Sequence, residues 1–264
     1  MRRGVELVPV MLHLFKHKLP IRSRTAQVGW IVDAEKAGVI WDAPRKISSE
    51  EPAATHAKSV RYCPAVIEHE ARYFEVPCAI DVSLRIGKDQ KTSEPVLINS
   101  AGDQSTIRSK QLTQLTSLVA RKEWRHPERP LIQIKTPYLF IADEPVYMTQ
   151  LPPFAFYAKT PWPGVQIGGR FPIHIWPRHL MWAFEWYDIS KDLVLRRGDP
   201  WFYVRFETED PSRPVRLVEA DMTEPLRQYT NSVSTVTNYV SRTFSLFNTA
   251  RERRPKTLMV PKHR

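Results

Sequence analysis

The feature that most constrains this 264-residue chain is an aromatic stretch from Leu131 to Glu207. It holds five of the eight tryptophans and most of the phenylalanines, in short apolar runs that proline and glycine interrupt. Proline breaks helix interiors and central strands, so the stretch favours short strands joined by turns over long helices. It therefore predicts several strands that close on one aromatic core.

The apolar runs are short and closely spaced along the stretch. They lie at 131–134, 138–141, 146–149, 154–157, 171–176, 180–187, 193–195 and 201–207. Upstream, Gln27–Val32 is a further strand candidate, and Ile80–Ile86 alternates apolar with polar residues, which indicates one face in water. The pattern predicts a mainly β fold, either a sandwich, a jelly roll or a barrel-like arrangement. Helical crossovers are missing between the runs, which argues against a parallel sheet.

Two other segments carry helical periodicity. Leu112, Leu115 and Val119 are spaced three and four apart and predict a short middle helix between Ser105 and Arg125. After a possible cap at Thr223, apolar residues recur at the same steps, at Leu226, Tyr229, Val233, Val236, Val240, Phe244 and Phe247. We expect one long C-terminal amphipathic helix, which either packs on the sheet or pairs with copies of itself in a homo-oligomer.

These patterns divide the chain into four segments. Residues 1–60 form an N-terminal segment that includes Gly4–Phe15, a possible first strand, and an exposed polar loop over 46–59. Residues 61–215 form the β-rich core domain, 216–250 the C-terminal helix, and 251–264 a basic tail.

The formal net charge of +11 belongs mostly to the two ends of the chain. Residues 1–24 and residues 251–264 each carry six basic and one acidic side chain, which leaves +1 for the body. A nucleic-acid groove needs cations clustered on the folded surface, so the charge pattern argues against nucleic-acid binding by the core. The ends are either solvated tails or contacts for an acidic partner.

The remaining compositional signals concern compartment and redox state. The apolar run Val8–Leu12 is too short, and its surroundings too polar, for a signal peptide or membrane span, so we expect a cytoplasmic protein. Cys63 and Cys78 lie outside any C-x-x-C pattern. Reduced thiols are favoured, and pairing between two strands stays open.

Histidine spacing bears on whether a metal is bound. His174, His179 and Glu185 suggest the metal set of cupin-like barrels, but a five-residue spacing makes the two imidazoles diverge. His13 and His17 have a helical spacing, yet Pro20 and the apolar neighbours disfavour a helix there. No metal and no cofactor is predicted.

Acidic residues and one possible pocket complete the chemistry. Two carboxylates could act as acid and base if the fold brings them together, and the candidates are Asp143, Glu144, Glu185, Asp188, Asp192 and Asp199. If a ligand pocket exists, we expect it where Trp162, Arg170, His174, Trp176 and Arg178 converge.

Leu193–Phe206 (LVLRRGDPWFYVRF) resembles the closing strand pair of the dUTPase and dCTP deaminase family of β-clip proteins, with a Gly-Asp turn between an apolar and an aromatic strand. Tyr138–Pro153 (YLFIADEPVYMTQLPP) is similar to that family's strand, acidic turn and Leu-Pro pattern. The resemblance implies β architecture. The family's phosphate-binding Ser-x-x-x-Arg loop should follow, but residues 159–170 contain Gly168-Gly169-Arg170 and no serine.

Two classes of function remain. A non-enzymatic protein that binds or assembles, such as a component of a phage or other particle, accounts for the near-neutral body, the apolar helix seam and the basic ends. The alternative is an enzyme on a jelly-roll or β-clip core that acts on a small molecule or nucleotide. It would use His174 or carboxylates near Arg170 and Arg197, either with a metal ion or without one. We favour the first class because no catalytic motif such as Gly-x-Ser-x-Gly is present.

Overall fold

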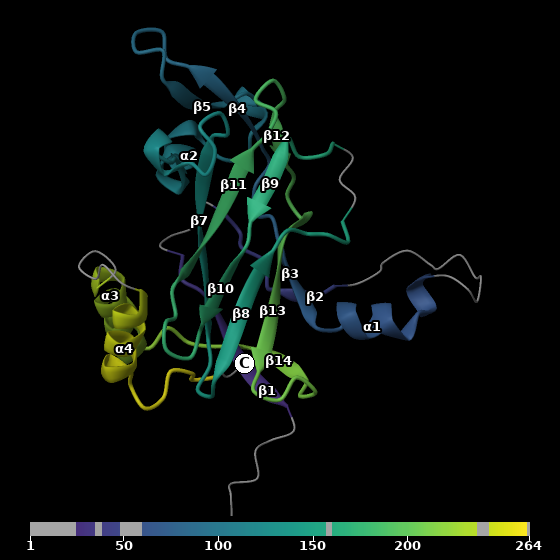
Figure 1. The fold of residues 1–264 in the computed structure, drawn as a ribbon, viewed down its shortest axis with the longest axis vertical. Coiled ribbons are helices and arrows are strands. Elements are labelled where there is room, and N and C mark those ends of the chain that lie inside the picture. The colour runs from purple at the N-terminus through teal and green to yellow at the C-terminus, as the bar shows by residue number, and fades with distance from the viewer. Residues whose placement is uncertain (1–24, 35–38, 48–59, 157–159, 237–242, 263–264) are drawn as a thin grey trace, which may run out of the picture.

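The computed structural model describes residues 25–34, 39–47, 60–156, 160–236 and 243–262, and these residues form three β-sheets with helices around them (Figure 1). The first sheet has the order β14 (Val215–Glu219), β1 (Ala26–Val32), β7 (Leu131–Ile141), β11 (His179–Trp186), β9 (Gly164–Ile167), and β6 (Thr116–Leu118) also pairs with β7. The second has the order β10 (Gly169–Pro172), β8 (Val146–Leu151), β13 (Pro200–Thr208), β3 (Tyr73–Pro77), β2 (Arg45–Lys46). The third has the order β12 (Leu193–Leu195), β4 (Val82–Lys88), β5 (Pro95–Asn99). The prediction of a mainly β fold is confirmed, and the described strands form no closed barrel.

Strand pairing is antiparallel with one exception among the described strands. β14 runs parallel to β1, with Val28 opposite Leu217. Local sequence did not indicate this pair, because most of the chain separates its two strands. The expectation of antiparallel pairing holds for the other described pairs.

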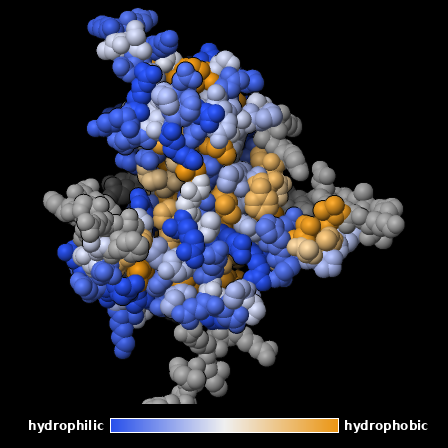
Figure 2. All heavy atoms as spheres, viewed as in Figure 1, coloured by the Kyte–Doolittle hydropathy of each residue, from blue (hydrophilic) through white to orange (hydrophobic). Residues whose placement is uncertain are grey.

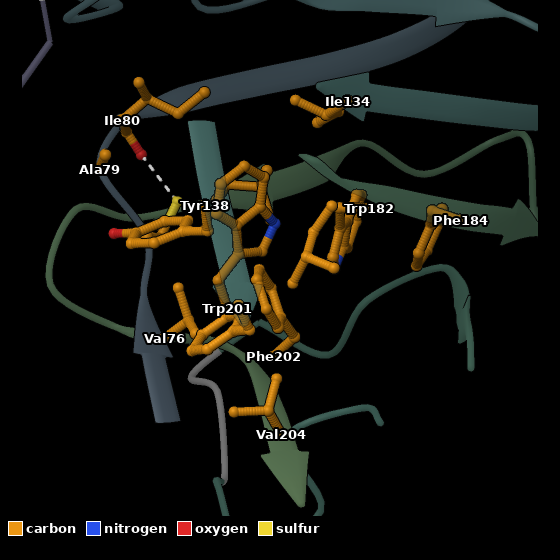
Figure 3. Packing of buried hydrophobic residues seen from close by; sticks show 14 of the residues in the cluster. Val76, Ala79, Ile80, Ile134, Tyr138, Trp182, Phe184, Trp201, Phe202 and Val204 are labelled. Atoms are coloured by element: carbon orange, nitrogen blue, oxygen red, sulfur yellow. Dashed lines mark hydrogen bonds between the residues drawn. The ribbon is translucent and has the colours of Figure 1, made fainter. Parts of the chain in front are cut away.

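The first and second sheets contribute to one hydrophobic core. The ring centroids of Phe140 in β7 and Phe206 in β13 are 5.5 Å apart. Those of Trp182 in β11 and Trp201 in β13 are 5.8 Å apart (Figure 3). Large aromatic side chains remove much apolar surface from water and add specific edge and face contacts. The aromatic stretch therefore supplies the core, as its composition predicts.

The two strands that resemble a β-clip pair lie in different sheets. β12 pairs with β4, whereas β13 pairs with β3 and β8. The turn between them contains Gly198 at a φ of 86°, a conformation that favours glycine. The Gly198 amide donates to the Cys78 carbonyl, so the turn is fixed to β3 rather than closing a hairpin.

Four α-helices lie around the sheets: α1 (Pro64–Glu70), α2 (Ser109–Leu115), α3 (Glu224–Val236) and α4 (Thr243–Arg253). The middle helix is shorter than expected, because the chain becomes extended at Thr116 and continues as β6. Three short 3-10 helices occur at Val60–Tyr62, Gly102–Gln104 and Arg121–Glu123.

The prediction of one long C-terminal helix is not confirmed, because the described residues form two helices that pack against each other. The Tyr229 hydroxyl donates to the carbonyl of Ala250, 21 residues later, at 2.8 Å. A straight helix would separate these residues by about 31 Å. Leu226, Tyr229 and Val233 of the expected seam are buried with Ile31, Leu139 and Ile141 of the first sheet, and Val240 lies outside the described residues.

The ends of the described chain are joined to the body. Leu258 is buried, Pro261 forms a bridge with Ala220, and Lys262 pairs with Glu219 at 2.8 Å. The expected basic tail is thus docked up to residue 262. Two other predicted segments lie outside the described residues: residues 1–24, which include Gly4–Phe15, His13 and His17, and residues 48–59 of the expected loop. None of the described helices is long and apolar enough to cross a membrane.

Candidate functional site

α1 and the 3-10 turn before it, residues 60–70, extend away from the sheets, and we call them the α1 arm (Figure 1). Pro64 begins the helix, where its missing N–H costs nothing. No residue of α1 is buried. Val60, Tyr62 and Ile67 are 70%, 50% and 51% exposed, and an apolar patch is visible on the arm in Figure 2.

The base of the α1 arm is fixed to the body. The His69 ring lies 4.9 Å from that of Tyr73 and 5.5 Å from that of Phe154. Arg72 donates to the Pro211 carbonyl and pairs with Glu68. An anchored arm that keeps apolar side chains in water is typical of a surface that another molecule covers.

Four of the five predicted pocket residues take part in two separate clusters of aromatic contacts. The Arg170 guanidinium lies 3.9 Å from the Tyr147 ring centroid, and the His174 ring lies 5.7 Å from the same ring. The Arg178 guanidinium lies 4.8 Å from the Trp176 ring. Trp162 instead packs against Trp182, at 5.6 Å.

The contacts of these residues join separate elements. Arg170 pairs with Glu207 of β13 at 3.0 Å. His174 Nδ1 lies 3.0 Å from the Val146 carbonyl oxygen, and burial lowers the pKa of the imidazole below its usual value. Trp176 packs on Phe247 of α4 at 5.5 Å. These contacts hold β8, β10 and α4 together.

Trp162 lies at a cavity of about 460 Å³ between the ends of β3 and β13. Cys78 and Trp201 also line it. The Cys78 thiol donates to the Ile80 carbonyl at 3.3 Å (dashed in Figure 3), and burial raises its pKa to about 12. Cys78 is therefore a poor nucleophile at neutral pH.

Five of the six candidate carboxylates, all except Asp199, pair with separate cations rather than with each other. Glu144 pairs with Arg213 at 2.6 Å, Glu185 with Arg129 at 3.4 Å, and Asp192 with Arg85 at 2.7 Å. Asp143 accepts from the Leu258 amide and pairs with Arg254, and Asp188 pairs with Lys191. Hydrogen bonds from Ser190 and Lys191 lower the pKa of Asp188 to about 2. Among the described residues, no group of three His, Cys, Asp or Glu side chains could hold a metal ion.

A second candidate site lies at an interruption in the first sheet. On one edge of β7, β6 pairs with Ile132–Ile134 and β1 pairs with Tyr138–Ile141, which leaves residues 135–137 without a strand partner on that edge among the described strands. The Asp33 amide makes the last bond of β1, to the Pro137 carbonyl at 2.9 Å. The interruption opens into a pocket of about 490 Å³, which we call the β7 notch.

Polar groups from the end of β1 and from β7, β11 and α2 meet at the β7 notch. Asp33, just after β1, accepts from His179 Nε2 at 3.1 Å and from Arg227 of α3 at 3.2 Å. Lys135 of β7 and Gln111 and Gln114 of α2 also line it. Its apolar wall consists mainly of Val39, Trp41, Ile107, Leu115, Pro137 and Met181.

Sequence reasoning did not identify the α1 arm or the β7 notch. Pro64, which suits the first position of a helix, was a signal for α1, with Ala65 and Glu68 as the helix-favouring residues after it. The notch had no local signal, because His179 and Asp33 are 146 residues apart and meet only through strand register. No protein-family model matches the chain, and no curated protein or solved structure matches it.

Proposed function

We propose that this chain is a non-enzymatic assembly protein that associates with further copies of itself through the α1 arm, as a component of a larger particle. The observation that carries the proposal is the exposure of Val60, Tyr62 and Ile67 on an anchored element with no buried residue. Covering such a face with a second copy removes apolar surface from water at little ordering cost, because the base of the arm is already held.

Charge supports a second copy as the partner. Residues 60–72 contain two arginines and two glutamates and have no formal net charge, whereas the whole chain carries +11. Two copies of a basic protein repel each other, and a neutral apolar segment is where they approach at the lowest electrostatic cost. A symmetric dimer would use the same arm on both subunits.

The self-association surface is then the α1 arm, rather than the C-terminal helix that the sequence suggested. The described seam residues of α3 are buried against the chain's own sheet and offer little to another subunit. We also infer that the first and second sheets form the two layers of a sandwich, from the core that they share. A rigid body of this kind suits a structural role.

Light scattering after gel filtration tests the proposal on the full chain. We expect a mass that is a multiple of 30.7 kDa, and a shift to the monomer in Ile67→Glu, because a buried unpaired carboxylate destabilises an apolar interface. Ile189→Glu is the matched control, since Ile189 is 48% exposed and lies outside the arm. It should keep the mass of the unmodified protein.

Cross-linking gives a second readout at the arm. Cys63 is an exposed free thiol directly before α1, whereas Cys78 is buried. A short bismaleimide should yield covalent dimers, and both Cys63→Ser and Ile67→Glu should reduce them strongly. A monomeric chain at all concentrations, or an Ile67→Glu variant that assembles normally, would contradict the proposal.

A further inference from the structure

The β7 notch has the form of a small-molecule site. Its volume of about 490 Å³ falls within the range of roughly 300–1,000 Å³ that such sites occupy. It is also built in the usual way, with an apolar wall and a few polar groups that converge from β1, β7, β11 and α2. The interruption between β1 and β6 explains why the pocket exists, because a paired strand would fill that space.

The charges at the notch are not balanced. The Asp33 carboxylate is already matched by the Arg227 guanidinium and also accepts a hydrogen bond from His179. The exposed side chain of Lys135 lines the same space, and no ion pair or side-chain hydrogen bond joins it to another described residue. Among the described residues, the notch therefore retains one unmatched cation, which favours an anionic group over a cationic one.

The apolar wall determines the rest of the ligand. Trp41, Ile107 and Leu115 line the pocket, and Met181, also in its lining, is the cross-strand neighbour of Lys135. Trp41 is held in place by an edge contact with Tyr138 at 5.8 Å and by stacking on Trp201 at 6.4 Å. A fixed aromatic wall suits a flat or extended apolar group.

We propose that the β7 notch binds a small amphipathic anion, in which an apolar ring or chain carries one carboxylate or sulfonate. The acidic group pairs with Lys135, and the amides of Gln111 and Gln114 add hydrogen bonds. The apolar part lies against Trp41, Ile107 and Leu115. This site is separate from the α1 arm, so the inference does not depend on self-association.

Titration of the full chain with anilinonaphthalene sulfonate, a fluorescent amphipathic anion, tests the proposal. We expect saturable binding, and binding about tenfold weaker in Lys135→Gln, as for loss of one contact between charged groups. Lys110→Gln is the matched control, because Lys110 is an exposed lysine of α2 that does not line the notch. It should bind the dye as the unmodified protein does.

Two further measurements locate the bound anion. Gln114→Lys in the Lys135→Gln background returns a cation to the notch and should restore most of the affinity. Uncharged phenylnaphthylamine, which has the rings without the sulfonate, should bind more weakly than the sulfonate to the unmodified protein and equally to Lys135→Gln. All titrations are repeated in the Ile67→Glu background, because the apolar α1 arm could also take up the dye.

Three results would overturn the proposal. They are absence of dye binding in the Ile67→Glu background, equal affinity of Lys135→Gln and the unmodified protein, and an equal loss in Lys110→Gln. Matching near-ultraviolet circular dichroism spectra establish that each variant is folded, since partly unfolded proteins also bind this dye.

Discussion

At the scale of single residues, the two cysteines show how burial decides reactivity. Cys63 is exposed in front of α1, and Cys78 lies in the core with its thiol bonded to the Ile80 carbonyl. Burial disfavours the thiolate, so it raises the pKa of Cys78 to about 12. The sequence left pairing open, and the fold gives each thiol separate surroundings.

We expect iodoacetamide at pH 8 to leave Cys78 unmodified in the native protein and to label it once urea unfolds the chain. The reason is that unfolding returns the thiol to water, where its pKa is about 8.5. Mass spectrometry of the Cys78 peptide measures the labelling. Rapid labelling of Cys78 in native buffer would contradict its burial, and Cys63 labelling in urea provides the reference rate.

At the scale of elements, α3 and α4 are joined by one hydroxyl. Tyr229 of α3 donates to the carbonyl of Ala250 in α4 at 2.8 Å and lies 2.5 Å from that of Ile175. Both contacts are buried, and leaving a buried carbonyl without a hydrogen bond would lower the stability of the fold. An exposed hydrogen bond from the Arg253 guanidinium to the Ser232 carbonyl, at 3.4 Å, and the apolar cluster shared with β1 and β7 also hold the two helices.

Tyr229→Phe should lower the free energy of unfolding by about 1–2 kcal/mol, because it removes the shared hydroxyl from a buried site. Tyr187→Phe should change it little, since Tyr187 is about half exposed. Urea unfolding of the two variants and the unmodified chain gives the comparison. Equal stability of Tyr229→Phe and the unmodified protein would show that the hydroxyl does not hold α3 to α4.

Elements with strong local patterns were predictable, and elements set by distant contacts were not. β12 has the predicted bounds 193–195, and β4 follows the alternation of Val82 and Leu84. The apolar seam at the C-terminus predicted one continuous helix, because periodicity alone does not reveal where the chain turns back between two helices. Of the candidate pocket, Arg170 and His174 do share Tyr147, but Trp162 packs elsewhere because it precedes a different strand, β9.

At the scale of the whole molecule, segments that looked separate in the sequence interlock. β1 from the N-terminal segment pairs with β7 of the core and with β14 at the junction to the C-terminal helices. Phe140 of the first sheet packs on Phe206 of the second, inside the shared core. We therefore expect the first and second sheets to unfold as one cooperative unit.

Phe140→Ala should therefore lower the stability of both sheets together, by about 3–5 kcal/mol, because a cavity opens where the first sheet meets the second. Far-ultraviolet circular dichroism and tryptophan fluorescence should report one urea transition with a common midpoint, shifted equally by the substitution. Phe154→Ala is the control, since its ring is about half exposed and its loss should cost less. If the two signals separated in Phe140→Ala, with one midpoint unmoved, the sheets would unfold independently and the shared core would not couple them.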